Sequence, residues 1–240
     1  MFVDHPAIDS MFLMPACFTN LADSIDNKIV LMSNPEVTSI KVVDSGDPLI
    51  DAEKEILAFD DRKRSQNPLL SFVRSELATR LHDAQQMLPL GYRLLGIEGY
   101  RPLSMQTFYF DRYRQGLIDA TPTVSPEEAD ELASRFVSPP AVAPHVSGAA
   151  IDVTLMDYRS KELDLGTPVD ANPEASQNAC YFAATNISAS ACRNREILRS
   201  VLTKVGLVNY PTEWWHWSYG DRYWALKNRA PHALFGPVDR

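Results

Sequence analysis

Apolar residues recur at helical spacing in three segments of the 240-residue chain. Residues 67–87 open with an Asn-Pro pair, suited to an N-cap and a first helical position, and predict a helix. Residues 125–137 open with Ser-Pro-Glu-Glu, the pattern of a capping box, and predict a second helix. The third segment, residues 197–205, is followed by Gly206, which we expect to end the helix.

Three other segments have the pattern of β-strands. Residues 91–98 form an apolar run that starts at a glycine and ends at a Gly-Tyr-Arg-Pro turn, and residues 207–217 predict a strand after the third helix. In residues 148–155, Ile, Val and Leu alternate with Ala, Asp and Thr. One face of that strand is apolar, so we expect Asp152 to project from the opposite face, away from the core.

Size and charge narrow the classes of function. With 45% hydrophobic residues, the chain is long enough for one substantial core, and we expect residues 1–240 to form a single domain. The formal net charge is -8, and no block of lysines or arginines occurs. Neither a nucleic acid nor an anionic membrane surface is therefore an expected partner.

Targeting signals and cysteines point to the cytoplasm. The first residues include acidic side chains where a signal peptide needs basic ones before an unbroken apolar run, and no apolar stretch approaches the about 18 residues of a membrane span. Cys17, Cys180 and Cys192 are an odd number, far apart and without C-x-x-C spacing. They predict neither a disulfide framework nor a thiolate zinc site, which fits a reducing compartment.

Two short stretches carry the candidate chemistry. His145 opens "HVSGAAID", where a Ser-Gly turn lets the chain fold back so that His145 and Asp152 can reach one metal ion. Glu213 and His216 lie three positions apart in "TEWWHW", and a regular strand would put them on opposite faces. We therefore expect a twist or a turn-like backbone between them. The tryptophans beside them would either line the site with apolar surface or be core residues that fix the local backbone.

Together these residues match the usual composition of a catalytic zinc site. Zinc hydrolases commonly use three ligands from His, Asp and Glu, keep the fourth position for water and place a free carboxylate beside that water as general base. His145, Asp152 and His216, with Glu213 as the carboxylate, fit this composition. The alternative is that each histidine is hydrogen-bonded in the core and Asp152 lies in a turn or an ion pair, with no metal bound.

Three separated motifs resemble a known family. "EGYRP", "PHVSGAAIDVTL" and "NYPTEWWHWSYGDRYWA" are similar to signatures of the D-alanyl-D-alanine dipeptidase family, zinc peptidases known from vancomycin resistance. The likeness covers roughly residues 65–225 and leaves residues 1–64 as a divergent N-terminal segment. It implies an α+β fold of the hedgehog/DD-peptidase type, with a central antiparallel sheet and flanking helices.

The resemblance also implies roles for single residues. It assigns zinc ligation to His145, Asp152 and His216 and general-base catalysis to Glu213. Arg101 corresponds to the arginine that contacts the scissile carbonyl oxygen as it becomes an oxyanion. A guanidinium there would place fixed positive charge where negative charge develops.

Substrate contacts follow from the same comparison. Asp170, in "GTPVD", corresponds to an aspartate near the free ammonium of the substrate. The vancomycin-resistance enzymes carry serines, implicated in gripping the substrate carboxylate, immediately before the first zinc histidine, where this chain has Ala143 and Pro144. We expect Ser147, just after that histidine, to substitute for them.

The sequence thus predicts a zinc-dependent dipeptidase that hydrolyses D-alanyl-D-alanine or a related D-amino-acid dipeptide with a free amino terminus. One alternative is a murein peptide carboxypeptidase or endopeptidase of the same fold, which should be exported. Another is a non-catalytic zinc-binding module, although such a module would not need Glu213 and Arg101. The dipeptide, the pathway and the oligomeric state stay open.

Overall fold

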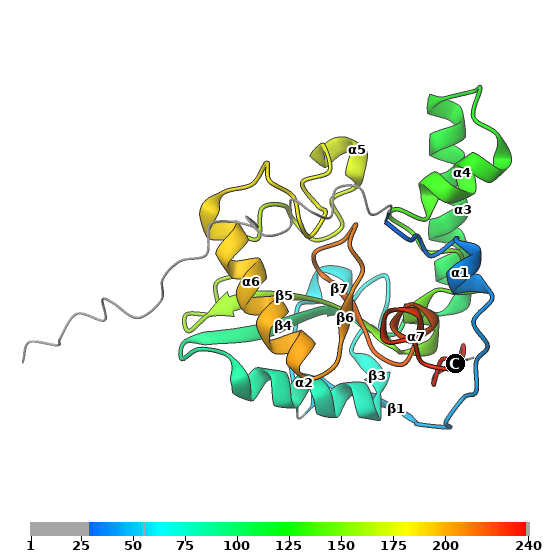
Figure 1. Ribbon diagram of the computed structural model, residues 1–240. Coiled ribbons are helices and arrows are strands. Elements are labelled where there is room, and N and C mark those ends of the chain that lie inside the picture. Colours follow the sequence, from blue (N-terminus) through cyan, green and yellow to red (C-terminus); the bar gives the residue numbers. More distant parts are fainter. Residues whose placement is uncertain (1–28, 55, 239–240) are drawn as a thin grey trace, which may run out of the picture.

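A five-stranded sheet forms the centre of the molecule (Figure 1). The computed structural model describes residues 29–54 and 56–238. The strands lie in the order β2 (Ala58–Phe59), β4 (Tyr92–Glu98), β5 (Ala150–Asp157), β7 (His216–Ser218) and β6 (Val208–Asn209). β2 pairs with β4 in parallel, and the other three pairs are antiparallel. The predicted α+β class and antiparallel central sheet with flanking helices are confirmed, apart from the parallel β2–β4 pair.

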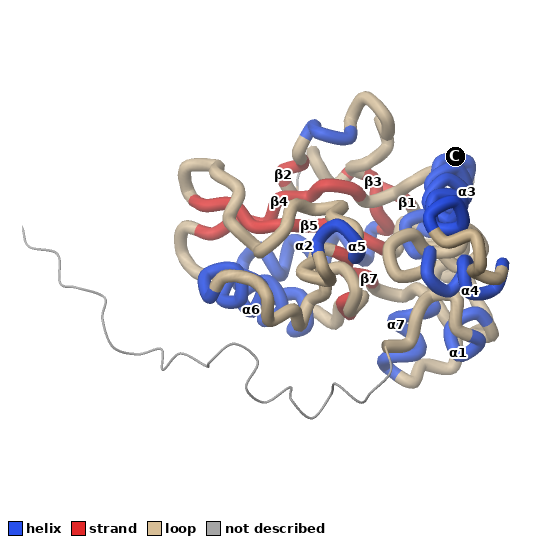
Figure 2. The backbone as a smooth tube through the Cα atoms, turned by 90° about the horizontal axis from the view of Figure 1, so that it is seen from above, coloured by secondary structure: helices blue, strands red, loops and turns tan. Residues whose placement is uncertain are grey.

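Helices and a small second sheet surround the central one. In the second sheet β1 (Leu49–Asp51) pairs antiparallel with β3 (Phe72–Arg74). The helices are α1 (Pro35–Thr38), α2 (Ser75–Met87), α3 (Leu103–Ala120), α4 (Pro126–Ala133), α5 (Pro173–Ser176), α6 (Ala189–Lys204) and α7 (Arg222–Asn228), with 3-10 turns η2 (Asp61–Lys63) and η3 (Pro144–Ser147). α2 packs beside α6, whereas α3 and α4 pack together at the other end of the molecule (Figure 2).

The main core joins the sheet to α2 and α6. Ile151, Val153 and Leu155 of β5 are fully buried in it, as their alternation predicted. Asp152 lies on the other face of β5, also as predicted, yet only 2% of it is exposed. Both faces of β5 are therefore covered, and Asp152 lies in the interior of the protein.

The first predicted helix begins later than its sequence pattern indicated. α2 starts at Ser75, because residues 72–74 are paired with β1 as strand β3. Asn67 does not cap this helix. Its side-chain amide donates to Glu98 Oε1 at 2.9 Å and to the Tyr100 carbonyl at 2.8 Å, and its oxygen accepts from a backbone N–H two residues on. The local spacing had placed Asn67 at the start of the helix, but its side chain instead makes tertiary hydrogen bonds.

The other helices agree in part with the prediction. α4 has the predicted capping box between Ser125 and Glu128, but its regular part ends at Ala133. α6 starts at Ala189, eight residues before the predicted segment, with the Ser188 hydroxyl as its N-cap. The long helix α3 had not been predicted.

Residues 207–217 are a hairpin and not one strand. β6 and β7 are paired antiparallel, and the backbone reverses between them. The N–H of Tyr210 donates to the carbonyl of His216 at 3.1 Å across the hairpin. The expected turn-like backbone between Glu213 and His216 therefore exists.

No helix within the described ranges is both long and apolar enough to cross a membrane. The first residues, on which the expectation of no signal peptide rested, lie outside the described ranges, as does Cys17. Cys180 is a free, buried thiol, whereas Cys192 is disulfide-bonded, which the cysteine pattern had not predicted. The cysteines thus lend no support to the predicted cytoplasmic location.

Candidate active site

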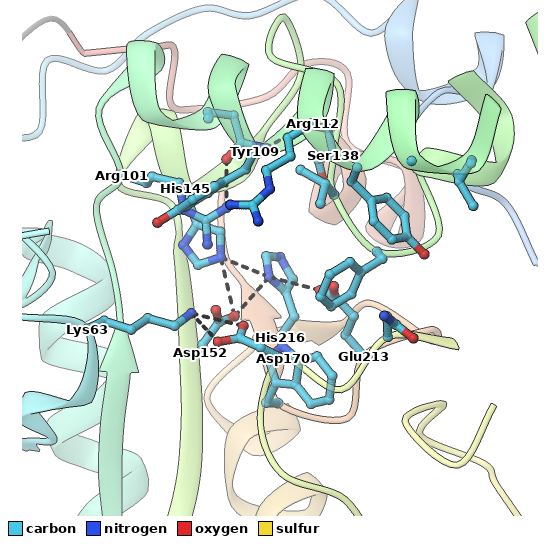
Figure 3. Close-up of a pocket in the computed structure, with 18 of the residues that line it drawn as sticks. Lys63, Arg101, Tyr109, Arg112, Ser138, His145, Asp152, Asp170, Glu213 and His216 are labelled. Carbon is cyan, nitrogen blue, oxygen red and sulfur yellow. Dashed lines mark hydrogen bonds and ion pairs between the residues drawn. The ribbon is translucent and has the colours of Figure 1, made fainter. Parts of the chain in front are cut away.

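Three predicted metal ligands meet in the interior of the protein (Figure 3). His145 comes from η3, Asp152 from β5 and His216 from the first position of β7. Asp152 and His216 are direct partners across the β5–β7 ladder, and Gly148, with φ 67°, turns the chain back from η3 into β5. The fold thus joins two segments that are about 70 residues apart in the sequence.

The three donor atoms form a nearly equilateral triangle. His145 Nε2 lies 3.1 Å from His216 Nδ1 and 3.3 Å from Asp152 Oδ1, and His216 Nδ1 lies 3.2 Å from the same oxygen. A tetrahedral zinc ion with bonds of about 2.0–2.1 Å separates its ligand atoms by about 3.3–3.4 Å. The spacing of the donor atoms therefore fits a zinc ion.

Hydrogen bonding points the same way. His145 Nδ1 lies 2.6 Å from the Gly99 carbonyl, which can only accept, so the proton of a neutral His145 is on Nδ1 and the Nε2 lone pair faces the other two donors. A single proton on His216 Nδ1 cannot serve both that lone pair and Asp152. A cation among the three atoms resolves this conflict.

Glu213 lies beside this cluster because of the turn before β7. Its backbone N–H donates to the Tyr210 carbonyl at 3.0 Å, and the His216 N–H donates to the Glu213 carbonyl at 3.2 Å. Asn209 reinforces the turn, since its side-chain amide donates to the carbonyls of Glu213 and His216, each at 2.9 Å. As a result Glu213 Oε2 lies 3.7 Å from His216 Nδ1. Sequence reasoning had missed Asn209.

The two carboxyl groups of the cluster differ in their electrostatics. Burial acts to raise the pKa of Asp152, but His145 and His216 outweigh it and hold that pKa well below its usual range. Burial raises the pKa of Glu213 well above its usual range, and the negative charges of Asp152 and Asp170 add to the effect. Asp152 is thus kept ionised, while Glu213 takes up a proton more readily than an ordinary glutamate does.

The tryptophans belong mainly to the core. Trp214, Trp215 and Trp217 are each at most 1% exposed. The indole N–H of Trp214 donates to Thr167 at 2.9 Å, and that of Trp217 donates to the Trp214 carbonyl at 3.1 Å. Trp215 also lines the cavity described below. Their packing fixes the backbone from which Glu213 and His216 project.

Arg101 is held beside the cluster by a buried carboxylate. Its Nε and Nη2 atoms donate to the two oxygens of Glu98 at 3.0 and 2.7 Å, and Nη1 donates to Gln106 Oε1 at 2.9 Å. Burial acts to lower the pKa of Arg101, but Glu98 raises it, so the guanidinium stays charged. Arg101 has N–H groups left over, because a guanidinium has five. Glu98 stands in "EGYRP", but its sequence position alone gave no sign of this contact.

A lysine that sequence reasoning had missed joins this network. Lys63 Nζ lies 2.9 Å from Glu98 Oε2 and 2.7 Å from Asp170 Oδ2. Burial acts to lower the pKa of Lys63, but Glu98 and Asp170 raise it. Asp170 lies in the left-handed region with φ 65° and its side chain is 43% exposed. The residue predicted to contact an ammonium group thus already contacts one.

Ser147 is the predicted site residue that the fold does not bring to the cavity. Its hydroxyl donates to the Pro144 carbonyl at 2.8 Å within η3, and the residue is buried. It does not line the cavity that contains the other predicted residues. The side chain satisfies the backbone of the 3-10 turn, so its predicted contact with the substrate carboxylate has no support.

A cavity of about 590 Å³ joins these side chains. The end of the cavity next to the three predicted metal ligands is lined by His145, Asp152, His216, Glu213, Arg101, Asp170 and Lys63, together with Gln66, Trp215 and Asn172. Its other side is formed mainly by one face of α3 and the segment after α4. These residues are Gln106, Tyr109, Arg112, Tyr113, Gly116, Leu117, Ala120, Phe136, Val137 and Ser138, with Glu174 beside them. The contribution of α3 had no signal in the motifs.

Comparison with known proteins identifies a family. The family described as D-ala-D-ala dipeptidase matches residues 59–233. A D-alanyl-D-alanine dipeptidase from Synechocystis sp. is 27% identical over 203 residues, covering 70% of this chain and 79% of that protein. One from Enterococcus faecium is 30% identical over 153 residues, covering 61% and 72%. One from Escherichia coli is 36% identical over 72 residues, covering 30% and 35%.

Two solved structures are also similar. The LdcB LD-carboxypeptidase aligns with a TM-score of 0.44 and 17% identity, covering 78% of this chain and 75% of that one. A mutant of the vancomycin resistance D,D-pentapeptidase VanY, in complex with Zn(II), aligns with a TM-score of 0.40 and 15% identity, covering 68% and 80%.

Proposed function

Because this chain belongs to the D-Ala-D-Ala dipeptidase family and is a peptidase, we propose that it is a zinc-dependent dipeptidase for a dipeptide of D-amino acids. The observation that carries the proposal is the triangle of donor atoms from His145, Asp152 and His216, with the Glu213 carboxylate 3.7 Å from one of them. The family match covers residues 59–233, and we propose that residues 1–240 are one domain.

His145, Asp152 and His216 would hold the zinc ion. When bound there, zinc would act as a Lewis acid that polarises the peptide carbonyl and lowers the pKa of water. The protein contributes a fixed donor set. His145 is oriented by its contact with the Gly99 carbonyl, and Asp152 and His216 by their pairing between adjacent strands. Such orientation of ligands by their surroundings raises metal affinity.

Glu213 would act as the general base and then as the general acid. Hydrolysis forms a bond from the water oxygen to the carbonyl carbon and breaks the bond from that carbon to the amide nitrogen. Glu213 accepts one proton from the water and later passes it to the leaving nitrogen, so that the protons balance. Its raised pKa suits both steps, because a group that shuttles protons works best with a pKa near the working pH.

Arg101 would bind the carbonyl oxygen as negative charge develops on it. The remaining N–H groups of its guanidinium are available for this, since Glu98 and Gln106 fix the rest of the side chain. Asp170, on the side of Lys63, would contact the free ammonium of the substrate. The substrate ammonium would share the Asp170 carboxylate with Lys63. We therefore expect the Asp170 contact to be weaker than the Arg101 contact with the carbonyl oxygen.

The test is Glu213→Gln, with zinc content and turnover measured on the same preparation. The variant keeps the shape of the side chain, so we expect full zinc with a 10²- to 10⁴-fold loss of rate on D-alanyl-D-alanine, the range of general acid–base catalysis. Loss of zinc would make Glu213 a ligand, and full activity would place the base elsewhere. A wild type that binds zinc but cleaves no peptide would favour a binding module.

Peptide length separates the dipeptidase from the carboxypeptidase or endopeptidase alternative. Acetylation of the dipeptide's amino terminus removes the ammonium that Asp170 would contact, so we expect cleavage to be abolished. Efficient hydrolysis of acetylated or longer peptides would contradict the dipeptidase assignment and support the alternative.

A further inference from the structure

The cavity continues beyond the catalytic residues into a largely apolar arm. We define this α3 arm by the residues Tyr113, Gly116, Leu117, Ala120, Phe136 and Val137, all of which line the cavity. The first four lie on one face of α3, because they occupy positions i, i+3, i+4 and i+7. The Tyr113 and Phe136 rings are packed edge to face with centroids 5.0 Å apart, so this wall is preformed.

The size of the cavity exceeds what two alanines need. Its volume of about 590 Å³ lies in the range of pockets that enclose drug-sized ligands, about 300–1,000 Å³. An alanyl-alanine dipeptide is much smaller than such a ligand and would leave the arm empty. Apolar walls gain free energy when an apolar group displaces water from them. The arm therefore fits a substrate with a larger apolar side chain.

One cation on the same side of the cavity is free to bind an anion. Of the three cations that line the cavity, Lys63 and Arg101 are ion-paired with Glu98. Arg112, on α3, has no hydrogen-bond or ion-pair partner among residues 29–54 and 56–238. The nearby carboxylate of Glu174 already accepts hydrogen bonds from Tyr113 and Arg135.

The charged residues at the two ends of the site determine how a bound dipeptide is oriented. In Figure 3, Arg112 lies on the α3 side of the metal-ligand cluster, and Asp170 with Lys63 lies on the opposite side. A dipeptide has an ammonium at one end and a carboxylate at the other. With its peptide bond at the cluster and its ammonium at Asp170, the carboxy-terminal residue extends toward Arg112 and the arm.

We propose that the α3 arm is the binding site for the carboxy-terminal residue of the substrate. Its apolar wall takes a large side chain such as that of leucine or phenylalanine, and Arg112 contacts the carboxylate. This inference rests on the proposed dipeptidase function and adds the class of substrate. The preferred substrates are dipeptides with a small amino-terminal and a large apolar carboxy-terminal residue.

A substrate panel tests the arm with the zinc-loaded, full-length protein. We expect kcat/KM for D-Ala-D-Phe and D-Ala-D-Leu to exceed that for D-Ala-D-Ala by about 10- to 100-fold, the effect of burying one large apolar side chain. D-Phe-D-Ala should show no such gain. Equal or better hydrolysis of D-Ala-D-Ala would overturn the inference but leave the dipeptidase function intact. Failure to hydrolyse any dipeptide would instead overturn the proposed function.

The role of Arg112 is tested by pairing a variant with a modified substrate. Amidation of the D-Ala-D-Phe carboxylate should raise KM for the wild type about tenfold. This factor corresponds to the lower end of the range for a hydrogen bond to a charged group, because Arg112 is exposed. Arg112→Gln should raise KM for the free acid by a similar factor and make the protein insensitive to amidation. Arg193→Gln, the same change on an exposed position of α6, is the matched control. Undiminished sensitivity to amidation in Arg112→Gln would overturn the contact.

Filling the arm gives an independent test. A Cβ at Gly116 would meet no heavy atom within 4 Å, so this position has room for a side chain. Gly116→Leu should reduce the preference for D-Ala-D-Phe over D-Ala-D-Ala about tenfold or more, because its side chain occupies the space of the substrate's ring. Gly116→Ala, which adds one methyl group, should keep most of the preference. Binding of D-Ala-D-Phe to the Glu213→Gln protein, measured by calorimetry, should weaken with Gly116→Leu. An unchanged preference and affinity would overturn the assignment of the arm.

Discussion

Replacing Glu98 by glutamine should cost both stability and catalysis. The Glu98 side chain is 1% exposed and accepts four hydrogen bonds, two on each oxygen. Asn67 and Arg101 Nε donate to Oε1, whereas Lys63 and Arg101 Nη2 donate to Oε2. In the glutamine variant an NH₂ group replaces one oxygen. In either orientation of the side-chain amide, its NH₂ group faces two hydrogen-bond donors. The negative charge of the carboxylate is also lost.

The magnitude follows from these contacts. Two hydrogen bonds to a charged group are lost, each worth about 1.5–3 kcal/mol; the buried Arg101 loses its counter-charge, while Lys63 keeps Asp170. Breaking a buried ion pair by removing one partner costs about 3–5 kcal/mol, which agrees with that sum. For a protein of this size about 1 kcal/mol shifts Tm by about 2–4 °C, so we expect Tm to fall by about 10 °C. Turnover should fall as well, because Arg101 loses the partner that orients it.

The dependence on pH provides a second measurement of the same interaction. Burial acts to raise the pKa of Glu98, but Arg101 and Lys63 lower it far below its usual value of 4.5. A lowered folded-state pKa gives stability that is fully present above the unfolded pKa and is lost as pH falls through the folded pKa. The difference in unfolding free energy between wild type and Glu98→Gln should therefore be constant above about pH 5 and shrink below it.

Denaturant and thermal unfolding of wild type, Glu98→Gln and Glu127→Gln would decide the matter. Glu127 is exposed at the start of α4, so its substitution should change stability by no more than about 0.5 kcal/mol. If Glu98→Gln unfolds within that margin of the wild type at pH 7, the buried network does not hold Arg101 and the reasoning is wrong.

The remaining predictions concern zinc binding, the oxyanion contact, the hairpin and α3. His216→Ala should lose zinc after dialysis and unfold at a lower temperature, because metal binding adds to folding free energy; full zinc by atomic absorption would contradict the ligand assignment. Arg101→Ala should keep zinc and lose turnover by about 10²-fold or more, and an unchanged kcat would remove Arg101 from the site. Asn209→Ala removes two hydrogen bonds to carbonyls that each keep a backbone N–H donor, so we expect a loss of about 1–3 kcal/mol by denaturant unfolding, and no loss would show that the amide does not hold the turn. Gly116→Ala should stabilise α3 by about 1 kcal/mol, and a lower Tm would show that the position does not tolerate a methyl group.

Local pattern was sufficient where one segment sets its own structure. The Ser125–Glu128 capping box formed as predicted, and so did β4 and β5, because apolar alternation and turn residues act within a few positions. Pattern failed where a distant segment competes. Residues 72–74 were predicted to be helical but pair with β1. The side-chain amide of Asn67 donates a hydrogen bond to Glu98, and the residue does not cap a helix.

For the site, the motifs identified the side chains that meet at the metal-ligand triangle, since a zinc site needs particular residue types at particular spacings. They did not identify the residues that hold those side chains. Glu98, Lys63 and Asn209 have ordinary side chains, and their partners lie on other elements or across a turn. Such contacts form only in the folded protein and have no signal in the sequence.

The sequence by itself determined the peptidase family, the α+β class and the two faces of β5, because these depend on residue type and short-range periodicity. The tertiary structure alone decided that Asp152 is buried and that α3 lines the cavity. The physical reason is that burial, pKa shifts and cavity shape depend on which distant surfaces pack together. That packing is a property of the whole chain and has no signature in any one of its segments.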